Sequence, residues 1–116
     1  MIDPARIHSL LRARLDEARA RDDELAGALE TLGALRDANT DDEHDPDGAP
    51  VSAEWSRLAG IRQDVQAELA AVHAALIRLE AGTYGVCASC GRPIDPARLE
   101  ARPTAELCIA CAQARR

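Results

Sequence analysis

The sequence contains almost no aromatic residues. Phenylalanine is absent, and one tryptophan and one tyrosine make up 2% of the 116 residues. A large core would therefore have to be built from leucine, alanine, isoleucine and valine, which pack well along the seam between helices. This composition favours paired helices over a broad globular core.

Lysine is missing altogether. All 14 basic residues are arginines, against 20 aspartates and glutamates, so the net charge is -6. This excess of negative charge disfavours broad adsorption to nucleic acid phosphates or to an anionic membrane surface. We therefore expect a protein partner, with no sequence-specific DNA binding and no membrane association.

Long apolar runs are missing too. Charged residues interrupt the first part of the chain every few positions, and no apolar run approaches the length that spans a membrane. The sequence thus predicts neither a signal peptide nor an anchor, and we expect a cytoplasmic protein. In that compartment, paired cysteines are metal ligands or redox groups more often than disulfides.

Apolar residues recur at helical spacing from Asp3 to about Ala38, which predicts one amphipathic helix. Asp3 is the expected N-cap, with Pro4 in the first turn. Asp22 falls where the stripe would place an apolar residue, and we expect it to be solvated, or the helices to splay locally, rather than a specific polar contact. The apolar residues of this stripe are Ile7, Leu11, Leu15, Ala18, Leu25, Leu29 and Leu32.

A second stripe follows an acidic segment. Residues 37–50 read DANTDDEHDPDGAP, and their crowded carboxylates, prolines and glycine predict a turn. Ser52 is the expected N-cap of the next helix, and Gly82 is expected to end it. The apolar residues of the second stripe are Trp55, Leu58, Ile61, Val65, Leu69, Val72, Leu76 and Leu79.

Two helices of about thirty residues joined by a short turn can bury their stripes against each other. The sequence therefore predicts an all-α fold in which residues 1–83 form a long antiparallel coiled-coil hairpin, roughly 45 Å long. Its acidic tip is expected at about 39–52, and a small four-cysteine zinc finger at 84–116. Pairing of each stripe with another chain is the alternative, and we expect a monomer.

Four cysteines form the strongest motif of the chain. Cys87 and Cys90 form one Cys-x-x-Cys pair, Cys108 and Cys111 form another, and seventeen residues separate the pairs. This spacing is typical of a tetrahedral zinc site. Four thiolates leave no position open for water, so we expect one structural Zn²⁺ rather than a catalytic ion.

The residues around the pairs support this interpretation. Each pair is expected on a tight knuckle, the first helped by Gly85 and Gly91, where small residues let backbone N–H groups turn towards sulfur. A thioredoxin-like redox motif is the competing interpretation, but it uses one Cys-x-x-Cys beside a βαβ unit, which this sequence lacks. A finger this small needs its metal to fold, so zinc removal is expected to disorder residues 84–116.

Residues that would indicate an enzyme are missing. The sequence offers no defensible Ser/His/Asp set, phosphate-binding glycine loop or carboxylate pair. His8 and His73 are expected on helix surfaces, and His44 in a solvated turn. We therefore expect no enzymatic activity.

The run TYGVCASCGRPIDPARLEARPTAELCIAC, residues 83–111, resembles the zinc finger of the TraR/DksA family. A finger placed behind a hairpin with an acidic tip is also that family's layout. The resemblance implies a transcription regulator that binds RNA polymerase and directs its tip through the secondary channel towards the catalytic centre. Family members often act together with the alarmone ppGpp.

The resemblance also implies which residues act at the tip. The family's Asp-x-x-Asp-x-Ala motif falls on His44, Asp47 and Ala49 when counted back from the first cysteine, so the second aspartate and the alanine match. Asp47 is the first candidate for the residue directed at the polymerase active site. Asp45 is the second, as a substitute for the carboxylate missing at position 44, and Asp42 and Asp41 are alternative substitutes.

For ppGpp, the resemblance implies an incomplete site. Arg102 matches one basic residue of the family's site and is the candidate for a residual, weak contact. Ala71 and Ala112 stand where the family has lysines. Fewer cations weaken a phosphate cradle, so we expect reduced or absent ppGpp dependence.

Two functions of other classes stay open at this point. One is a zinc-stapled coiled-coil adaptor whose stripes or finger bind a protein other than RNA polymerase. The other is a redox sensor in which oxidation of the zinc-bound thiolates releases the metal.

Overall fold

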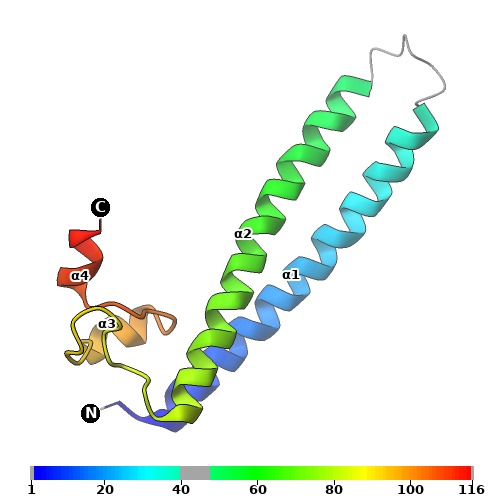
Figure 1. The fold of residues 1–116 in the computed structure, drawn as a ribbon. Helices are drawn as coiled ribbons and strands as arrows, with labels where there is room; N and C mark the ends of the chain where they lie inside the picture. Colours follow the sequence, from blue (N-terminus) through cyan, green and yellow to red (C-terminus); the bar gives the residue numbers. More distant parts are fainter. Residues whose placement is uncertain (1, 40–47, 116) are drawn as a thin grey trace. The chain divides into compact units, whose positions relative to one another are not determined.

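The computed structural model of the protein describes residues 2–39 and 48–115, and most of these residues are helical (Figure 1). Helix α1 spans Pro4–Asn39, α2 spans Gly48–Ala81, α3 spans Pro96–Ala101 and α4 spans Ile109–Ala114. The described residues contain no sheet, and their one isolated β-bridge joins Val86 to Pro93. The predicted all-α fold is confirmed.

Helix α1 begins as the sequence predicts. The Asp3 carboxylate accepts a hydrogen bond from the backbone N–H of Ala5 at 3.0 Å, and the Asp3 carbonyl accepts one from Ile7 at 3.1 Å. These bonds satisfy N–H groups that have no partner within the helix. Pro4 lacks an N–H group, so the first helical position suits it.

Helix α2 begins earlier than predicted. Ser52 is not its N-cap, because the helix already starts at Gly48. Pro50 stands in the first turn, where its missing N–H would have had no helical partner and costs little. The end of the helix is as predicted: Gly82 has a φ of 79°, and the N–H of Thr83 bonds to the Arg78 carbonyl at 2.9 Å, as in a Schellman motif.

The chain divides into two compact units, and α1 and α2 contribute to both. Unit 1 consists of Met1–Asp16 and Leu69–Arg116, and unit 2 consists of Glu17–Glu68. Unit 1 therefore holds the first turns of α1, the last turns of α2 and the cysteine-containing segment. Unit 2 holds the remainder of both long helices.

The helical core of unit 1 is formed by buried side chains of α1 and α2. Leu11, Leu15, Val72 and Ala75 are fully shielded from solvent, and Ile7 is 2% exposed. Positions early in α1 meet positions late in α2, so these helix segments run antiparallel, as predicted. Around this cluster pack partly buried Ile2, Leu10, Leu69, Leu76, Leu79 and Tyr84.

Unit 2 corrects the prediction made for Asp22. Its carboxylate is not simply solvated, because Oδ1 accepts a hydrogen bond from Nε of Arg62 at 2.9 Å. Further along the same two helices, the Arg36 guanidinium lies 5.1 Å from the centre of the Trp55 ring. The contact positions advance along α1 as they retreat along α2, so these segments are antiparallel too.

Among the described helices, none combines the length and the apolar character that crossing a lipid bilayer requires.

Truncation of a buried leucine of α1 should destabilise the protein more than truncation of an exposed one. Leu15→Ala removes a fully buried side chain and should lower the free energy of unfolding by about 2–5 kcal/mol. Urea denaturation of the zinc-loaded protein, followed by far-UV circular dichroism, measures it. The matched control is Leu35→Ala in the same helix: Leu35 is 50% exposed, so we expect a change of about 0.5 kcal/mol or less. Equal losses in the two variants would contradict the assigned core.

Candidate metal centre

The first cysteine pair lies on a tight turn between Val86 and Pro93. The N–H of Cys87 bonds to the Arg92 carbonyl at 2.8 Å, and the N–H of Gly91 bonds to the Cys87 carbonyl at 2.9 Å. Gly91 has a φ of 74°, a conformation that L side chains rarely adopt. The predicted knuckle is therefore confirmed for this pair.

Gly85 is required for a second reason besides its φ of 83°. A Cβ atom at this position would come within 3.0 Å of Ile2 Cδ1 and 3.4 Å of Leu99 Cδ1. The Gly85 carbonyl also accepts a hydrogen bond from the N–H of Ile94 at 2.7 Å. The absence of a side chain thus lets the turn pack against Ile2 and Leu99.

The second pair is built differently from the prediction. Cys108 is the N-cap residue of α4, and Cys111 stands in the first turn of that helix. The Cys108 carbonyl accepts a hydrogen bond from the N–H of Ala112 at 2.9 Å. A helix N-terminus, rather than a glycine knuckle, therefore places these two sulfur atoms.

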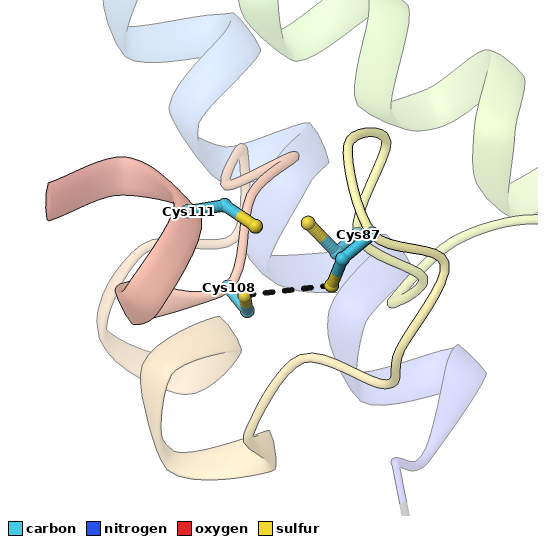
Figure 2. A group of neighbouring side chains, drawn as sticks. Cys87, Cys108 and Cys111 are labelled. Atoms are coloured by element: carbon cyan, nitrogen blue, oxygen red, sulfur yellow. Dashed lines mark hydrogen bonds between the residues drawn. The ribbon is translucent and has the colours of Figure 1, made fainter. Parts of the chain in front are cut away.

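The four sulfur atoms converge. All four Sγ atoms lie within 4.8 Å of one another, and Cys90 Sγ is 3.8 Å from Cys108 Sγ. Figure 2 shows the side chains of Cys87, Cys108 and Cys111 turned towards a common centre. Zinc–sulfur bonds of about 2.3 Å in a tetrahedron place neighbouring sulfurs about 3.8 Å apart, so the donors have the spacing that zinc needs.

The two pairs are also held together by the backbone. The N–H of Ala88, between the first two cysteines, bonds to the carbonyl of Glu106 at 2.8 Å. This bond crosses from one pair to the segment that leads into the other. The cluster therefore does not depend on the metal bonds alone for its alignment.

Hydrogen bonds to sulfur shift the pKa values of two of the cysteines in opposite directions. The backbone N–H groups of Cys90 and Cys108 donate to the Cys87 sulfur and lower the pKa of this thiol from 9.0 to about 6, although burial opposes them. The pKa of Cys111 is raised to about 12, first because of its hydrogen bond with Cys108 and then because of those with Cys87 and Cys90. The cluster thus favours one thiolate without a cation and needs a divalent ion to carry four.

A small apolar core supports the metal ligands. Cys87, Ile94 and Leu99 are buried together, with Leu99 completely shielded. Helix α3 carries Leu99 and begins where the Asp95 carboxylate accepts a hydrogen bond from the N–H of Ala97 at 2.9 Å. Partly buried Ile2, Tyr84, Ala105, Leu107, Cys108 and Cys111 surround this core.

Side-chain donors fasten the loop between α3 and α4. The Tyr84 hydroxyl donates to the Pro103 carbonyl at 2.7 Å, and burial raises the pKa of this hydroxyl. Arg98 Nε donates to the Leu107 carbonyl at 3.0 Å, and Arg78 donates to the Thr104 carbonyl at 3.4 Å. Sequence reasoning did not predict these roles. Every residue has a backbone carbonyl, so residue types do not reveal which carbonyl accepts a hydrogen bond.

Two arginines of α1 also reach α3. Arg6 binds both carboxylate oxygens of Glu100, at 2.8 and 3.0 Å, and this ion pair raises the Arg6 pKa. Arg14 donates to the Ala101 carbonyl at 3.3 Å. Both side chains of the Arg6–Glu100 pair are about half exposed, so the pair contributes orientation more than stability.

The other candidate residues lie apart from this cluster or outside the described residues. His44, Asp45 and Asp47 are outside them, and Ala49 is in the first turn of α2, without a described side chain. Arg102 is exposed and is the C-cap residue of α3. His8 and His73 are exposed, as predicted.

Comparison with known proteins matches this arrangement. Residues 82–116 fit the family model described as the prokaryotic dksA/traR C4-type zinc finger. The RNA polymerase-binding transcription factor DksA of Haemophilus influenzae is 34% identical over 72% of this chain. The chain carries a zinc finger of the DksA/TraR family. Its four cysteines form a structural zinc site, which confirms the predicted cofactor.

Further relatives show how far the similarity of this chain extends. DksA of Caulobacter vibrioides is 44% identical over 51% of the chain and 43% of its own length. The solved structure of transcription factor DksA2 from Pseudomonas aeruginosa has a TM-score of 0.83 and 28% identity, covering 97% of this chain and 81% of that one. The chain spans 58% of the length of the Haemophilus relative.

Zinc removal should unfold this DksA/TraR finger selectively. Chelation, or Cys108→Ser, should abolish the protection of amide hydrogens from exchange in residues 84–115 because α3 and α4, with six residues each, are too short to persist alone. Hydrogen exchange with mass spectrometry measures this, with Ser89→Ala as a control that keeps all four ligands. Retained protection in the zinc-free protein would contradict the assigned role of the metal.

Proposed function

We propose that this protein regulates transcription by binding RNA polymerase through its secondary channel. The observation that carries the proposal is the combination of a DksA/TraR zinc finger with two long antiparallel helices separated by an acidic segment. The relatives at 34% and 44% identity are named RNA polymerase-binding transcription factors. In this proposal the protein is a cytoplasmic, monomeric regulator and not an enzyme.

The proposed division of labour follows the chain. Residues 1–83 form the hairpin, the acidic segment at about 39–52 is its working end, and residues 84–116 form the finger. Asp47 is directed at the polymerase catalytic centre, with Asp45, His44 and Ala49 beside it in sequence. Carboxylates suit a site that holds basic side chains and a divalent cation.

Charge supports a protein partner over direct DNA binding. The net charge of -6 opposes non-specific attraction to phosphates. Arginines 92, 98, 102, 115 and 116 make the finger sequence locally basic, which suits an acidic protein surface. We therefore propose that the finger docks on protein and that the chain reads no DNA sequence.

The decisive test is binding of the zinc-loaded protein to core RNA polymerase in competition with a factor that occupies the secondary channel. We expect mutually exclusive binding. Asp47→Ala should then bind but lose its effect on transcript yield, because the change removes only the carboxylate proposed to act at the catalytic centre. Glu43→Ala is the charge-matched control and should keep the effect.

Two outcomes would overturn parts of this proposal. Absence of competition would remove the channel and favour a zinc-stapled adaptor for another protein. Full activity of Asp47→Ala would leave the channel but reject the assignment of the tip residue.

We also propose that ppGpp has little or no influence on this regulator. Arg102 is retained, but Ala71 and Ala112 stand at the family's lysine positions and cannot contact phosphate ionically. Transcription assays with the protein and polymerase should therefore give the same response with and without ppGpp. A ppGpp-dependent response that disappears in Arg102→Ala would show that the site is functional.

A further inference from the structure

Asp22 and Arg62 form a polar contact at a position where the stripe of α1 would place an apolar residue. Asp22 interrupts the apolar stripe of α1, yet its side chain is only 20% exposed, and that of Arg62 is 34% exposed. Their N–O distance is 2.9 Å, and the contact with Asp22 raises the Arg62 pKa. The pair lies within unit 2 and joins α1 directly to α2.

The Glu54–Arg57 pair, by contrast, does not join the two helices. It has an equally short contact of 2.7 Å, but both residues belong to α2, three positions apart. Its side chains are 43% and 60% exposed. The Glu54–Arg57 pair therefore cannot fix the position of α1 along α2, whereas the Asp22–Arg62 pair can.

In unit 2, apolar packing alone defines the register between α1 and α2 only weakly. Of the described residues in this unit, Ala18 and Val65 are the buried apolar ones, and the leucines that follow along α1 are only partly buried or exposed. Stripes of alanine and leucine look alike from one turn to the next, so they discriminate poorly between neighbouring registers. A slip of one turn moves one helix by about 5.4 Å relative to the other.

We propose that the Asp22–Arg62 pair sets the register between α1 and α2 and so positions the two helix ends that flank the acidic segment. Those ends are Asn39, 17 residues beyond Asp22, and Gly48, 14 residues before Arg62. At 1.5 Å per residue the pair is about 21–26 Å from them, so it acts through the helices. The Arg36–Trp55 contact lies between the pair and the ends.

The pair should matter more for specificity than for stability. A partly buried ion pair loses hydration, and replacing both members by apolar residues is often neutral or stabilising. A single polar residue in a coiled-coil seam can nevertheless fix register, because every other register leaves it unpaired. The register role concerns the free protein alone, and only its expected effect on transcription rests on the proposed function.

The test compares three double variants with the wild type. Asp22→Leu/Arg62→Leu removes the polar pair, Asp22→Arg/Arg62→Asp reverses it, and Glu54→Leu/Arg57→Leu is the matched control within α2. Nitroxide labels at the exposed positions Glu17 and Ser52, attached through introduced keto side chains, leave the cysteines untouched. With Asp22 opposite Arg62, these positions are roughly 20 Å apart along the helix axis, so a slip of one turn changes their distance by nearly its full length. Pulsed electron paramagnetic resonance then gives the distance between the helices in the free protein.

We expect the leucine pair to keep or raise the unfolding temperature while its label distance shifts or splits by about 5 Å. The reversed pair should restore the wild-type distance, and the control should keep it. In polymerase assays the leucine pair should bind within about threefold of wild type but lose at least about tenfold of its transcriptional effect, since misplacement of about 1 Å can cost more than that at an active site.

The outcomes separate this inference from the proposed function. An unchanged distance in the leucine pair, or no recovery in the reversed pair, would overturn the register role whatever the polymerase assays show. A shifted and restored distance in a protein that fails to compete for polymerase would support the register role and overturn the proposed function.

Discussion

The need to neutralise four thiolates whose sulfur atoms lie within 4.8 Å of one another is the constraint on which the finger depends. Backbone N–H groups lower the pKa of the Cys87 thiol, whereas hydrogen bonds with the neighbouring cysteines raise the pKa of Cys111. A divalent cation meets that need and joins a turn to a helix N-terminus. Helices α3 and α4 are too short to form independently, so they need the metal in addition to the small core and hydrogen bonds around it.

The finger is also tied to the first turns of α1. Ile2 contacts both the helical core of unit 1 and the small core beside the cysteines, and Arg6 reaches Glu100 from a position 94 residues away in sequence. Tyr84 and Arg78 add hydrogen bonds to carbonyls between α3 and α4. Within unit 1, the first turns of α1 and the end of α2 therefore pack together with the finger.

Sequence reasoning succeeded where a local pattern determines structure. Apolar periodicity predicted α1 and α2, Asp3 and Gly82 marked two of their ends, and the cysteine spacing predicted the zinc site. It failed where the cause lies elsewhere in the fold. Asp22 was expected to be solvated because periodicity along one helix does not reveal Arg62, 40 positions away. Ser52 was expected to cap α2 because its preference is strong, but the first turn tolerates Pro50 and begins sooner.

The scarcity of aromatic residues also has an optical consequence. The single tyrosine, Tyr84, is partly buried beside the cysteines in unit 1, whereas the single tryptophan, Trp55, lies under Arg36 in unit 2. Each unit thus contains one natural chromophore of a different kind. Selective excitation of tryptophan fluorescence reports on one unit, and ultraviolet difference absorbance of tyrosine reports on the other. The unlabelled protein can therefore reveal whether its two units melt together or in sequence.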